Sequence, residues 1–345
     1  MAPTLLEPNS QITSVQVPNI ERFNAVESKF AVDDEIPTID YSMLFSDDPL
    51  HRSSALQCLG DACDEFGFFY LVNHGLPDSV IEGTLKAIGD FFEQTPKEEK
   101  ESFMKKKPTD AVMWGCNSHS GENREYLKVI TSPQLHCPSN PRGFREALEE
   151  YFGRFELVKI GLAKAISVSL GFEESYIEKA FNLHSGFDVA AMNLYPPGFQ
   201  SKGSIGVPSH TDPGFIVSLI QDLNGGLQVL THKGKWVNAH IPRNAFLIQL
   251  GDHLEVLTNG RYKSHVHHVV VDNNKARRIS LATLHGPSLD TFISPKSEFV
   301  DVHNNPPAYI GMTYKDSLQA NGHGVIEVQS CLDQLRVGSC FISEK

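Results

Sequence analysis

The sequence predicts a mainly β protein with helices, built on a double-stranded β-helix, or jelly roll, that follows an N-terminal α/β part. Two observations lead to this fold class. Short apolar runs with a period of two residues follow one another after residue 190, and Gly, Pro and Asn turns separate them. Ahead of these runs, residues 143–172 carry apolar side chains at helical spacing, which predicts one long helix that backs the core.

The first hundred residues alternate between strand and helix patterns. Two apolar runs suit strands, and two segments with apolar residues three and four positions apart suit helices. The expected strands cover 36–40 and 66–72, and the expected helices cover 52–65 and 77–94. Residues 106–142 show little periodicity and many Asn, Ser, Pro and Gly, so we expect a long loop over a site there.

The second half carries the strands of the expected jelly roll. In the long helix, Gly171 stands where a left-handed residue would end the helix. The predicted strands that follow are 192–195, 215–220, 227–230, 236–239, 246–250, 265–271 and 278–284. No repeat or flexible linker interrupts the chain, so the two halves are expected to form one fold.

Composition narrows the class of function. Lys and Arg total 30 against 42 Asp and Glu, which gives a net charge of −12 and disfavours a nucleic-acid partner. The six cysteines form no CxxC pair, so a zinc ribbon or disulfide scaffold is not expected, and a reducing compartment fits. No signal peptide or membrane-length apolar run is visible. We therefore expect a cytoplasmic protein without membrane or nucleic-acid partners. We also expect it to work as a monomer.

The sharpest chemical motif is His210-Thr211-Asp212. An imidazole and a carboxylate two residues apart point from the same side of an extended segment, as two ligands of one metal ion would. His/Asp/His with open positions is the ligand set of non-haem iron(II) oxygenases. An isolated HxD is more often a solvated turn, and the residues alone leave four candidates for the third ligand: His253, His265, His267 and His268.

A second motif supports the interpretation of the first as a metal site. Arg278 and Ser280 share one face of a predicted strand, and a guanidinium with a hydroxyl captures a carboxylate. Tyr195 lies on an earlier predicted strand with Asn193 on the same face, and its phenol could donate to the same ligand. Each of these residues alone would more often be an ordinary surface or core residue.

At this point the sequence resembles the plant-type iron(II)- and 2-oxoglutarate-dependent dioxygenases of specialised and hormone metabolism. The likeness covers most of the chain. It rests on segments in the family's order and spacing: IPTID, ACDEFGFFYLVNHGLP, FFEQTPKEEK, NLYPP, VPSHTDPG, GGLQV, GKWV, GDHLEVLTNGRYKS and RRIS. Any one of these is short, but together they are specific.

The resemblance selects the third metal ligand. In the family the metal histidine stands five residues after the Tyr of the YKS motif, which is His267 here. The resemblance thus implies an iron site of His210, Asp212 and His267, and a 2-oxoglutarate site of Arg278, Ser280, Tyr195 and, with less support, Asn193. It implies decarboxylation of 2-oxoglutarate to succinate and CO2, with O2 consumed and a small metabolite hydroxylated, desaturated, dealkylated or cyclised. Ascorbate is the expected reductant in assays.

The resemblance also sets the expected domain boundaries and the roles of other histidines. His268 departs from the usual Arg, and strand alternation turns it away from the metal, while His265 shares the face of His267. His253 is expected to be packed, and His74 to lie in a turn. The expected parts are a flexible N-terminus (1–30), a leader domain (31–105), a lid-like loop (106–142), the backing helix (143–172), the jelly roll (185–300) and a C-terminal segment (301–345).

Two other classes of function remain open from the sequence. One is an iron oxidase of the same fold that does not use 2-oxoglutarate, and the other is a jelly-roll binding protein without catalysis. A zinc hydrolase would offer no reason for Arg278 and Ser280. The substrate pocket is expected to be apolar, which favours a small aromatic or alicyclic plant metabolite. Its expected lining is Met113, Asn117, Phe215, Ala282 and Leu284, each of which could equally be core.

Overall fold

A computed structural model describes residues 36–107, 110–117, 124–197, 205–271, 276–320 and 332–338. The chain divides into two units, 1–30 and 31–345, and every described residue belongs to the second. The N-terminal segment 1–30, expected to be flexible, lies outside the described residues.

The largest element is an eight-stranded sheet in which one neighbouring pair, β1 with β2, is parallel and the others are antiparallel. Strands from both halves of the chain contribute to it, so the expected leader domain 31–105 shares a sheet with the expected core. In spatial order the strands are β1 (Thr38–Asp40), β2 (Phe68–Val72), β10 (Phe246–Leu250), β7 (Ile216–Gln221), β12 (Arg278–His285), β5 (Asp188–Tyr195), β4 (Arg124–Ser132) and β3 (Val112–Asn117).

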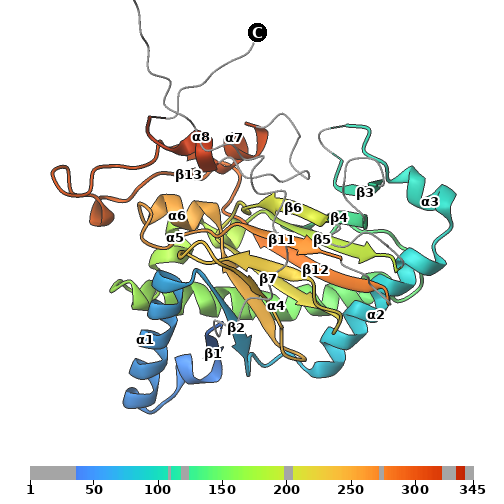
Figure 1. Ribbon diagram of the computed structural model, residues 1–345, viewed down its shortest axis with the longest axis horizontal. Coiled ribbons are helices and arrows are strands. Elements are labelled where there is room, and N and C mark those ends of the chain that lie inside the picture. The colour runs from blue at the N-terminus through green and yellow to red at the C-terminus, as the bar shows by residue number, and fades with distance from the viewer. Residues whose placement is uncertain are drawn as a thin grey trace, which may run out of the picture. The chain divides into compact units, whose positions relative to one another are not determined.

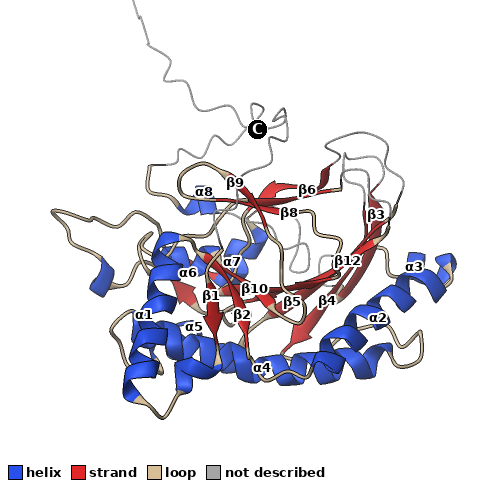
Figure 2. Ribbon diagram, turned by 60° about the horizontal axis from the view of Figure 1, so that its bottom comes forward, coloured by secondary structure: helices blue, strands red, loops and turns tan. Residues whose placement is uncertain are grey.

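A four-stranded sheet faces the main sheet (Figure 2). Its strands are β6 (Ile205–His210), β11 (His267–Val270), β8 (Leu227–Leu230) and β9 (Trp236–Asn238). An apolar cluster that includes Tyr195, Leu219, Val229, Leu247 and Val269 joins the two sheets. Two facing sheets of mainly antiparallel strands confirm the predicted jelly roll. A third, small sheet pairs β13 (Phe292–Ile293) with β14 (Met312–Thr313).

Helices cover the outer face of the main sheet, with α4 and α2 running beneath it (Figures 1 and 2). The predicted backing helix is α4, and Gly171 follows it at φ +88°, as expected of a left-handed C-terminal residue. No described helix is both long and apolar enough to cross a membrane. The helices are α1 (Pro49–Glu65), α2 (Asp78–Gln94), α3 (Lys97–Ser102), α4 (Phe144–Ser169), α5 (Tyr176–Phe181), α6 (Asp252–Leu257), α7 (Tyr314–Gln319) and α8 (Leu332–Leu335).

A buried polar cluster fixes α4 against the main sheet. One carboxylate oxygen of Asp188 binds Lys159 Nζ at 3.1 Å and His285 Nδ1 at 2.9 Å, and His285 Nε2 lies 2.9 Å from Ser218 Oγ. The hydrogen bonds connect Ser218 to His285 and His285 to Asp188, the same series of residue types as in a serine hydrolase triad. These side chains are almost fully buried in the layer between sheet and helix, where no substrate reaches Ser218.

The expectation of a long loop over 106–142 was wrong for two stretches of it, because β3 and β4 form the edge of the main sheet there. Side chains of β4 alternate between two sides of the strand. The inward residues Arg124, Tyr126 and Lys128 are polar, so only residues such as Leu127 and Val129 on the other side give an apolar pattern. The segment 252–257 is a buried helix, although its alternating apolar residues resemble a strand.

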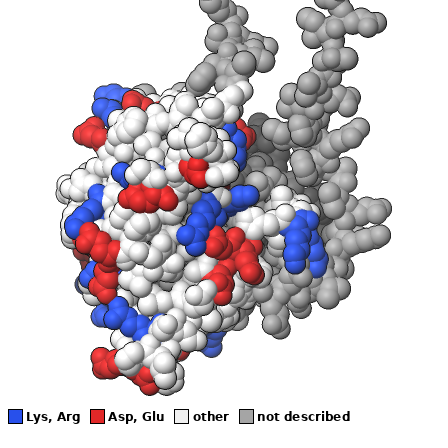
Figure 3. All heavy atoms as spheres, turned by 90° about the vertical axis from the view of Figure 1, so that its left-hand side faces the viewer, with Lys and Arg blue, Asp and Glu red and all other residues white. Residues whose placement is uncertain are grey.

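Charges of both signs are mixed on one face of the molecule. On the face in Figure 3, acidic and basic side chains are interspersed. Ion pairs of this kind include Arg52 with Glu174 at 2.7 Å and Arg261 with Asp64 at 3.3 Å. The field of such a surface is local, because each positive group has a negative group near it.

Candidate active site

Three predicted metal ligands come together where β6 ends and β11 begins. His210 and His267 lie directly opposite each other in the register of these two strands. The carboxylate of Asp212 bridges the two rings, with Oδ1 3.5 Å from His210 Nε2 and Oδ2 3.3 Å from His267 Nε2. One donor atom from each residue fits within 4.8 Å of the others. Strand pairing therefore unites residues that are far apart in sequence.

Backbone carbonyls fix the orientation of both imidazoles. His210 Nδ1 lies 2.8 Å from the carbonyl oxygen of Pro208, and His267 Nδ1 lies 3.3 Å from that of His265. A carbonyl only accepts, so each Nδ1 carries a proton, which leaves Nε2 as the ring nitrogen that would offer its lone pair to a bound metal ion. Two neutral imidazoles with a carboxylate are the donor set that a non-haem iron(II) ion takes, and these residues fit one.

Electrostatics keep the carboxylate of this cluster ionised. Burial raises the pKa of Asp212. The charges of His267 and His210 and their hydrogen bonds to the carboxylate have a larger, opposite effect, so the pKa of Asp212 lies well below its ordinary value. Burial likewise lowers the pKa of His210, and the hydrogen bond and charge of Asp212 reverse the sign and raise it. The cluster therefore presents a negative charge to a cation at neutral pH.

The loop after Asp212 is held by α6. The backbone N–H of Asp252 donates to the carbonyl oxygen of Asp212 at 2.9 Å, and the N–H of Gly214 donates to His253 Nδ1 at 2.9 Å. Gly214 has φ +111° and lies so close to the His285 carbonyl that an added Cβ would be 2.8 Å from its oxygen. The position of Asp212 therefore depends on contacts to two residues of α6.

A buried cation forms the second centre of the site. The guanidinium of Arg278, which is 1% exposed, donates from Nη1 to Ser280 Oγ at 3.2 Å and from Nη2 to Gln221 Oε1 at 2.6 Å. Its Nε donates to the carbonyl oxygen of Gly225. The guanidinium carbon also lies 4.7 Å from the centre of the Tyr195 ring. These partners are neutral, so the positive charge of Arg278 remains available to an anion.

Strand register brings the four predicted 2-oxoglutarate residues onto one face. Arg278 is opposite Tyr195, and Ser280 is opposite Asn193, in the antiparallel pair of β12 and β5. The metal-bearing sheet packs on this face, because a Cβ added to Gly206 of β6 would lie 2.7 Å from the Tyr195 ring. We call this face of the main sheet the inner face.

The predicted pocket residues divide into two groups. Met113, Ala282 and Leu284 belong to the inner face by register, and Met113 and Ala282 lie in one cross-strand row. Phe215 is fully buried, and its ring packs on Phe181 in the main apolar core, which accounts for it without a ligand. Asn117 is the last residue of β3, opposite Arg124 in backbone register; its side chain lies outside the described structure.

The other histidines named from the sequence have structural partners. The ring of His268 stacks on Trp236 at 3.9 Å and bonds to Gln228, away from the metal cluster as strand alternation predicts. His265 contributes its backbone carbonyl to His267, while its ring packs at 5.5 Å against Phe68. His253 and His74 are both buried and hydrogen-bonded.

Sequence reasoning missed several residues of this site. Gln221 and Gly225 hold Arg278, and Arg124 donates from Nη1 to Asn193 Oδ1 at 2.6 Å. Gln249 is a single amide in the apolar strand β10, and its Oε1 and Nε2 are buried without a hydrogen-bond partner among the described residues. An isolated amide inside an apolar run was the available signal for Gln249.

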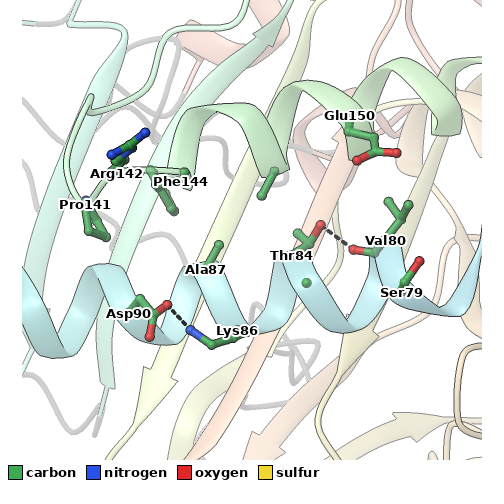
Figure 4. A pocket seen from close by; sticks show the side chains of 13 residues that line it. Ser79, Val80, Thr84, Lys86, Ala87, Asp90, Pro141, Arg142, Phe144 and Glu150 are labelled. Atoms are coloured by element: carbon green, nitrogen blue, oxygen red, sulfur yellow. Dashed lines mark hydrogen bonds and ion pairs between the residues drawn. The ribbon is translucent and has the colours of Figure 1, made fainter.

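A separate hollow lies between α2 and the beginning of α4 (Figure 4). Its volume is about 240 Å³, and Thr84, Asp90, Phe144 and Glu150 are among its lining residues. The two helices that form it cover the outer face of the main sheet (Figure 2), whereas His210 and His267 belong to β6 and β11 of the four-stranded sheet that packs on the inner face. This hollow contains none of the residues predicted for the site.

Comparison with known proteins agrees with this geometry. The sequence pattern of the 2OG-Fe(II) oxygenase superfamily matches residues 186–287, which include the three clustered ligands and Arg278. A rice (Oryza sativa subsp. japonica) protein named 2-oxoglutarate-dependent dioxygenase 19 is 34% identical over 308 residues, which are 88% of this chain and 90% of the rice protein. The chain belongs to the 2OG-Fe(II) oxygenase superfamily.

Further matches extend along the whole oxygenase. The pattern described as "non-haem dioxygenase in morphine synthesis N-terminal" matches residues 36–146. The Arabidopsis thaliana protein DMR6-LIKE OXYGENASE 2 is 31% identical over 321 residues, covering 89% of this chain and 88% of that protein. The crystal structure of JOX2 in complex with 2OG, Fe and JA is 26% identical, covers 95% of both chains and superposes with a TM-score of 0.76.

Membership of this superfamily gives the reaction class. The protein is an iron(II)- and 2-oxoglutarate-dependent oxygenase, and it couples decarboxylation of 2-oxoglutarate to the oxidation of a small organic substrate. Fe(II) and 2-oxoglutarate are its cofactor and co-substrate.

Proposed function

We propose that this oxygenase oxidises a small plant specialised metabolite. In this proposal His210, Asp212 and His267 hold the iron, and Arg278, Ser280, Tyr195 and Asn193 bind 2-oxoglutarate. The observation that carries it is the convergence of His210 Nε2, His267 Nε2 and the Asp212 carboxylate within 4.8 Å, at the end of the sheet that packs on the face bearing Arg278.

The protein residues have distinct parts in this scheme. Bound Fe(II) supplies the activation of O2, and three protein ligands leave positions for the co-substrate and O2. Arg278 and Ser280 bind the distal carboxylate of 2-oxoglutarate through charge-assisted hydrogen bonds, and Gln221 and the Gly225 carbonyl keep the guanidinium oriented. Burial of Tyr195 and Arg278 excludes water from that carboxylate.

A metabolite screen tests the proposed function. The purified protein is incubated with plant metabolite fractions, Fe(II), ascorbate and 2-oxoglutarate, and the readouts are succinate and a product that gains one oxygen or loses two hydrogens. The variants H210A and D212A are the matched controls, and both are expected to yield neither readout. A substrate oxidised without coupled succinate would contradict the proposed use of 2-oxoglutarate, and full activity in either variant would remove these residues from the metal site.

The surroundings of the site support a proposed role for 106–142. Strands β3 and β4 of this range form the edge of the main sheet beside β5, and Arg124 contacts Asn193. We propose that this range covers the substrate entrance, over the jelly roll of 185–300. Proteolysis of the holoprotein with and without substrate tests it, since a covering segment should become protected when substrate binds.

The compartment and assembly state are also proposals. The described cysteines, Cys58, Cys63, Cys116 and Cys137, are free thiols, which supports a reducing compartment. We propose a cytoplasmic monomer. Imaging of a fluorescent fusion tests the compartment, and sedimentation equilibrium at several protein concentrations tests the monomer.

A further inference from the structure

Two basic side chains stand on the inner face of β4, beside the proposed oxygenase site. Arg124 and Lys128 flank Tyr126, with the guanidinium carbon of Arg124 5.1 Å and Nζ of Lys128 5.9 Å from the centre of its ring. The spacing of two residues places these three side chains on the same side of the strand. The edge of the expected apolar pocket lining therefore carries two basic side chains.

Strand register relates Lys128 to the predicted substrate wall. Lys128 lies opposite Met113 on β3 and opposite Ala191 on β5, and Ala191 in turn lies opposite Ala282 on β12. Both alanines end at Cβ, so the positions next to Lys128 in this cross-strand row carry small side chains. The half-buried ammonium of Lys128 is thus placed beside small residues on the face that bears the 2-oxoglutarate residues.

Arg124 lies closer to the reacting centre. Its Nη1 donates to Asn193 Oδ1 at 2.6 Å, and Asn193 is one of the proposed 2-oxoglutarate residues. A guanidinium has five N–H donors in a planar fork, so a bond to Asn193 is compatible with a second acceptor.

Tyr126 is fixed between the two cations. Its ring lies over Gly115 of the neighbouring strand, where an added Cβ would be 2.4 Å from the phenol oxygen. Because Tyr126 fills the space above Gly115, the two basic groups keep a defined separation along β4. The phenol also offers a hydrogen bond near both charges.

We propose that Arg124 and Lys128 bind a carboxylate of the organic substrate, so that the oxygenase acts on an anionic small molecule. This inference rests on the proposed function and names the substrate class of the same site. The carboxylate receives charge-assisted hydrogen bonds from β4, and the uncharged part of the substrate lies along Ala191, Ala282 and Leu284. The carboxylate that Arg278 binds belongs to the co-substrate and is a different one.

Matched pairs of acids and amides test this proposal without knowledge of the natural substrate. A library of aromatic and alicyclic carboxylic acids, including phenylacetate, cinnamate and cyclohexanecarboxylate, is mixed with the corresponding primary amides. The protein is loaded with Fe(II) and 2-oxoglutarate without O2, and retained compounds are identified by mass spectrometry and measured by calorimetry. An acid and its amide share shape, so a difference in affinity reports the charge.

The wild-type protein should bind at least one acid about ten- to hundredfold more tightly than its amide, the range expected for a charge-assisted hydrogen bond. K128Q and R124Q should each reduce that preference about tenfold or more. R154Q and K179Q are the matched controls, because both residues lie on exposed helix surfaces in ion pairs with Glu150 and Glu173. R124Q also removes the hydrogen bond to Asn193 Oδ1 in the proposed 2-oxoglutarate site, so K128Q serves as a second variant that leaves this bond in place.

The outcomes separate this inference from the proposed function. Equal retention of acids and amides, retention of neither, or an unchanged preference in both K128Q and R124Q would overturn the inference. Binding of 2-oxoglutarate is measured in the same samples. If 2-oxoglutarate binds and no acid is preferred, only the anionic substrate class fails; if 2-oxoglutarate does not bind, the proposed function fails first.

Discussion

Nδ1 of His253 accepts a hydrogen bond of 2.9 Å from the backbone N–H of Gly214, two residues after the proposed ligand Asp212. The other ring nitrogen of His253 lies 2.9 Å from Ser317 Oγ on α7. One buried imidazole thus links the loop that carries Asp212 to the C-terminal part of the fold. Its neutral form suits this position, since burial lowers the pKa of His253 to about 3.

This depressed pKa predicts a dependence of stability on pH. An unfolded histidine has a pKa of about 6.5, so between about pH 6.5 and 3 the unfolded state binds a proton that the folded state does not. The contribution of His253 to stability is complete above pH 6.5 and is lost as the pH falls, by about 2 kcal/mol at pH 5. The free energy of unfolding of H253N, measured with urea, should be lower than that of the wild type at pH 7. It should also change less than the wild-type value between pH 7 and 5. The exposed-site variant H303N should keep the wild-type slope, and an equally steep slope in H253N would refute the assignment.

Metal binding should stabilise the folded protein through the three clustered ligands. A ligand at one hundred times its dissociation constant adds about 2.7 kcal/mol to the free energy of unfolding. Under anaerobic conditions Fe(II) should therefore raise the melting temperature of the wild-type protein, and EDTA should reverse the increase. H210A and H267A should show no such increase, whereas H268A should retain it, because that ring stacks on Trp236. A metal-dependent increase in H210A equal to that of the wild type would exclude His210 as a ligand.

Loss of the Arg278 guanidinium should weaken 2-oxoglutarate binding by about ten- to hundredfold, the range for hydrogen bonds to charged groups. R278L removes both the charge and the fork, while R278K keeps a charge but cannot reach Ser280 and Gln221 together in a planar geometry. We expect the affinity for 2-oxoglutarate, measured by calorimetry, to decrease from the wild type to R278K and further to R278L. R277Q is the neighbouring control, since Arg277 pairs with Glu93 of α2. An unchanged affinity in R278L would place the co-substrate elsewhere.

Breaking the buried cluster behind the sheet should reduce stability far more than it affects ligand affinity. D188N removes the sheet-side carboxylate from Lys159, which keeps Glu156 of α4 at 2.7 Å, and it removes the carboxylate that holds His285. We expect a loss of about 1–3 kcal/mol, the cost of leaving a buried polar group without its partner. Burial raises the pKa of Asp188, but His285 and Lys159 lower it overall, so its contribution is present at neutral pH and is lost in acid. Guanidinium unfolding at pH 7 measures the loss, with the exposed D61N as control. A loss below 1 kcal/mol would contradict this account.

Much of the site was accessible from the sequence because its chemistry is carried by short-range patterns. His210 and Asp212 are two residues apart, as are Arg278 and Ser280, and alternation along a strand suffices to place each pair on one side. The choice of His267 among four histidines needed the family resemblance, because spacing alone cannot show that β11 pairs with β6 in the register that opposes His267 to His210.

Other parts of the site depend on long-range pairing and could not be predicted in this way. The sequence alone does not distinguish Gln221 from other polar residues at strand ends. Its contact with Arg278 follows only from the pairing of β7 with β12. Strand β4 was missed because its inward side is basic and aromatic, and a period-two pattern is recognised by apolar residues on one face. The same polar side of β4 carries Arg124 and Lys128, so the error in secondary structure concealed the charged edge of the pocket.

The alternation along β12 has a consequence for how such oxygenases diverge. Arg278, Ser280, Ala282 and Leu284 follow one another at every second position of a single strand, with Thr283 and His285 facing the helices. In the proposed site, replacement of Ala282 or Leu284 would change which molecule is accepted while the proposed 2-oxoglutarate residues Arg278 and Ser280 stay in place. An inserted residue between Ser280 and Ala282 would instead exchange the two sides of the strand beyond it. On this proposal, point substitution gives the fold a route to new substrates, whereas insertion within β12 would displace the proposed substrate wall and also disrupt the Asp188 cluster.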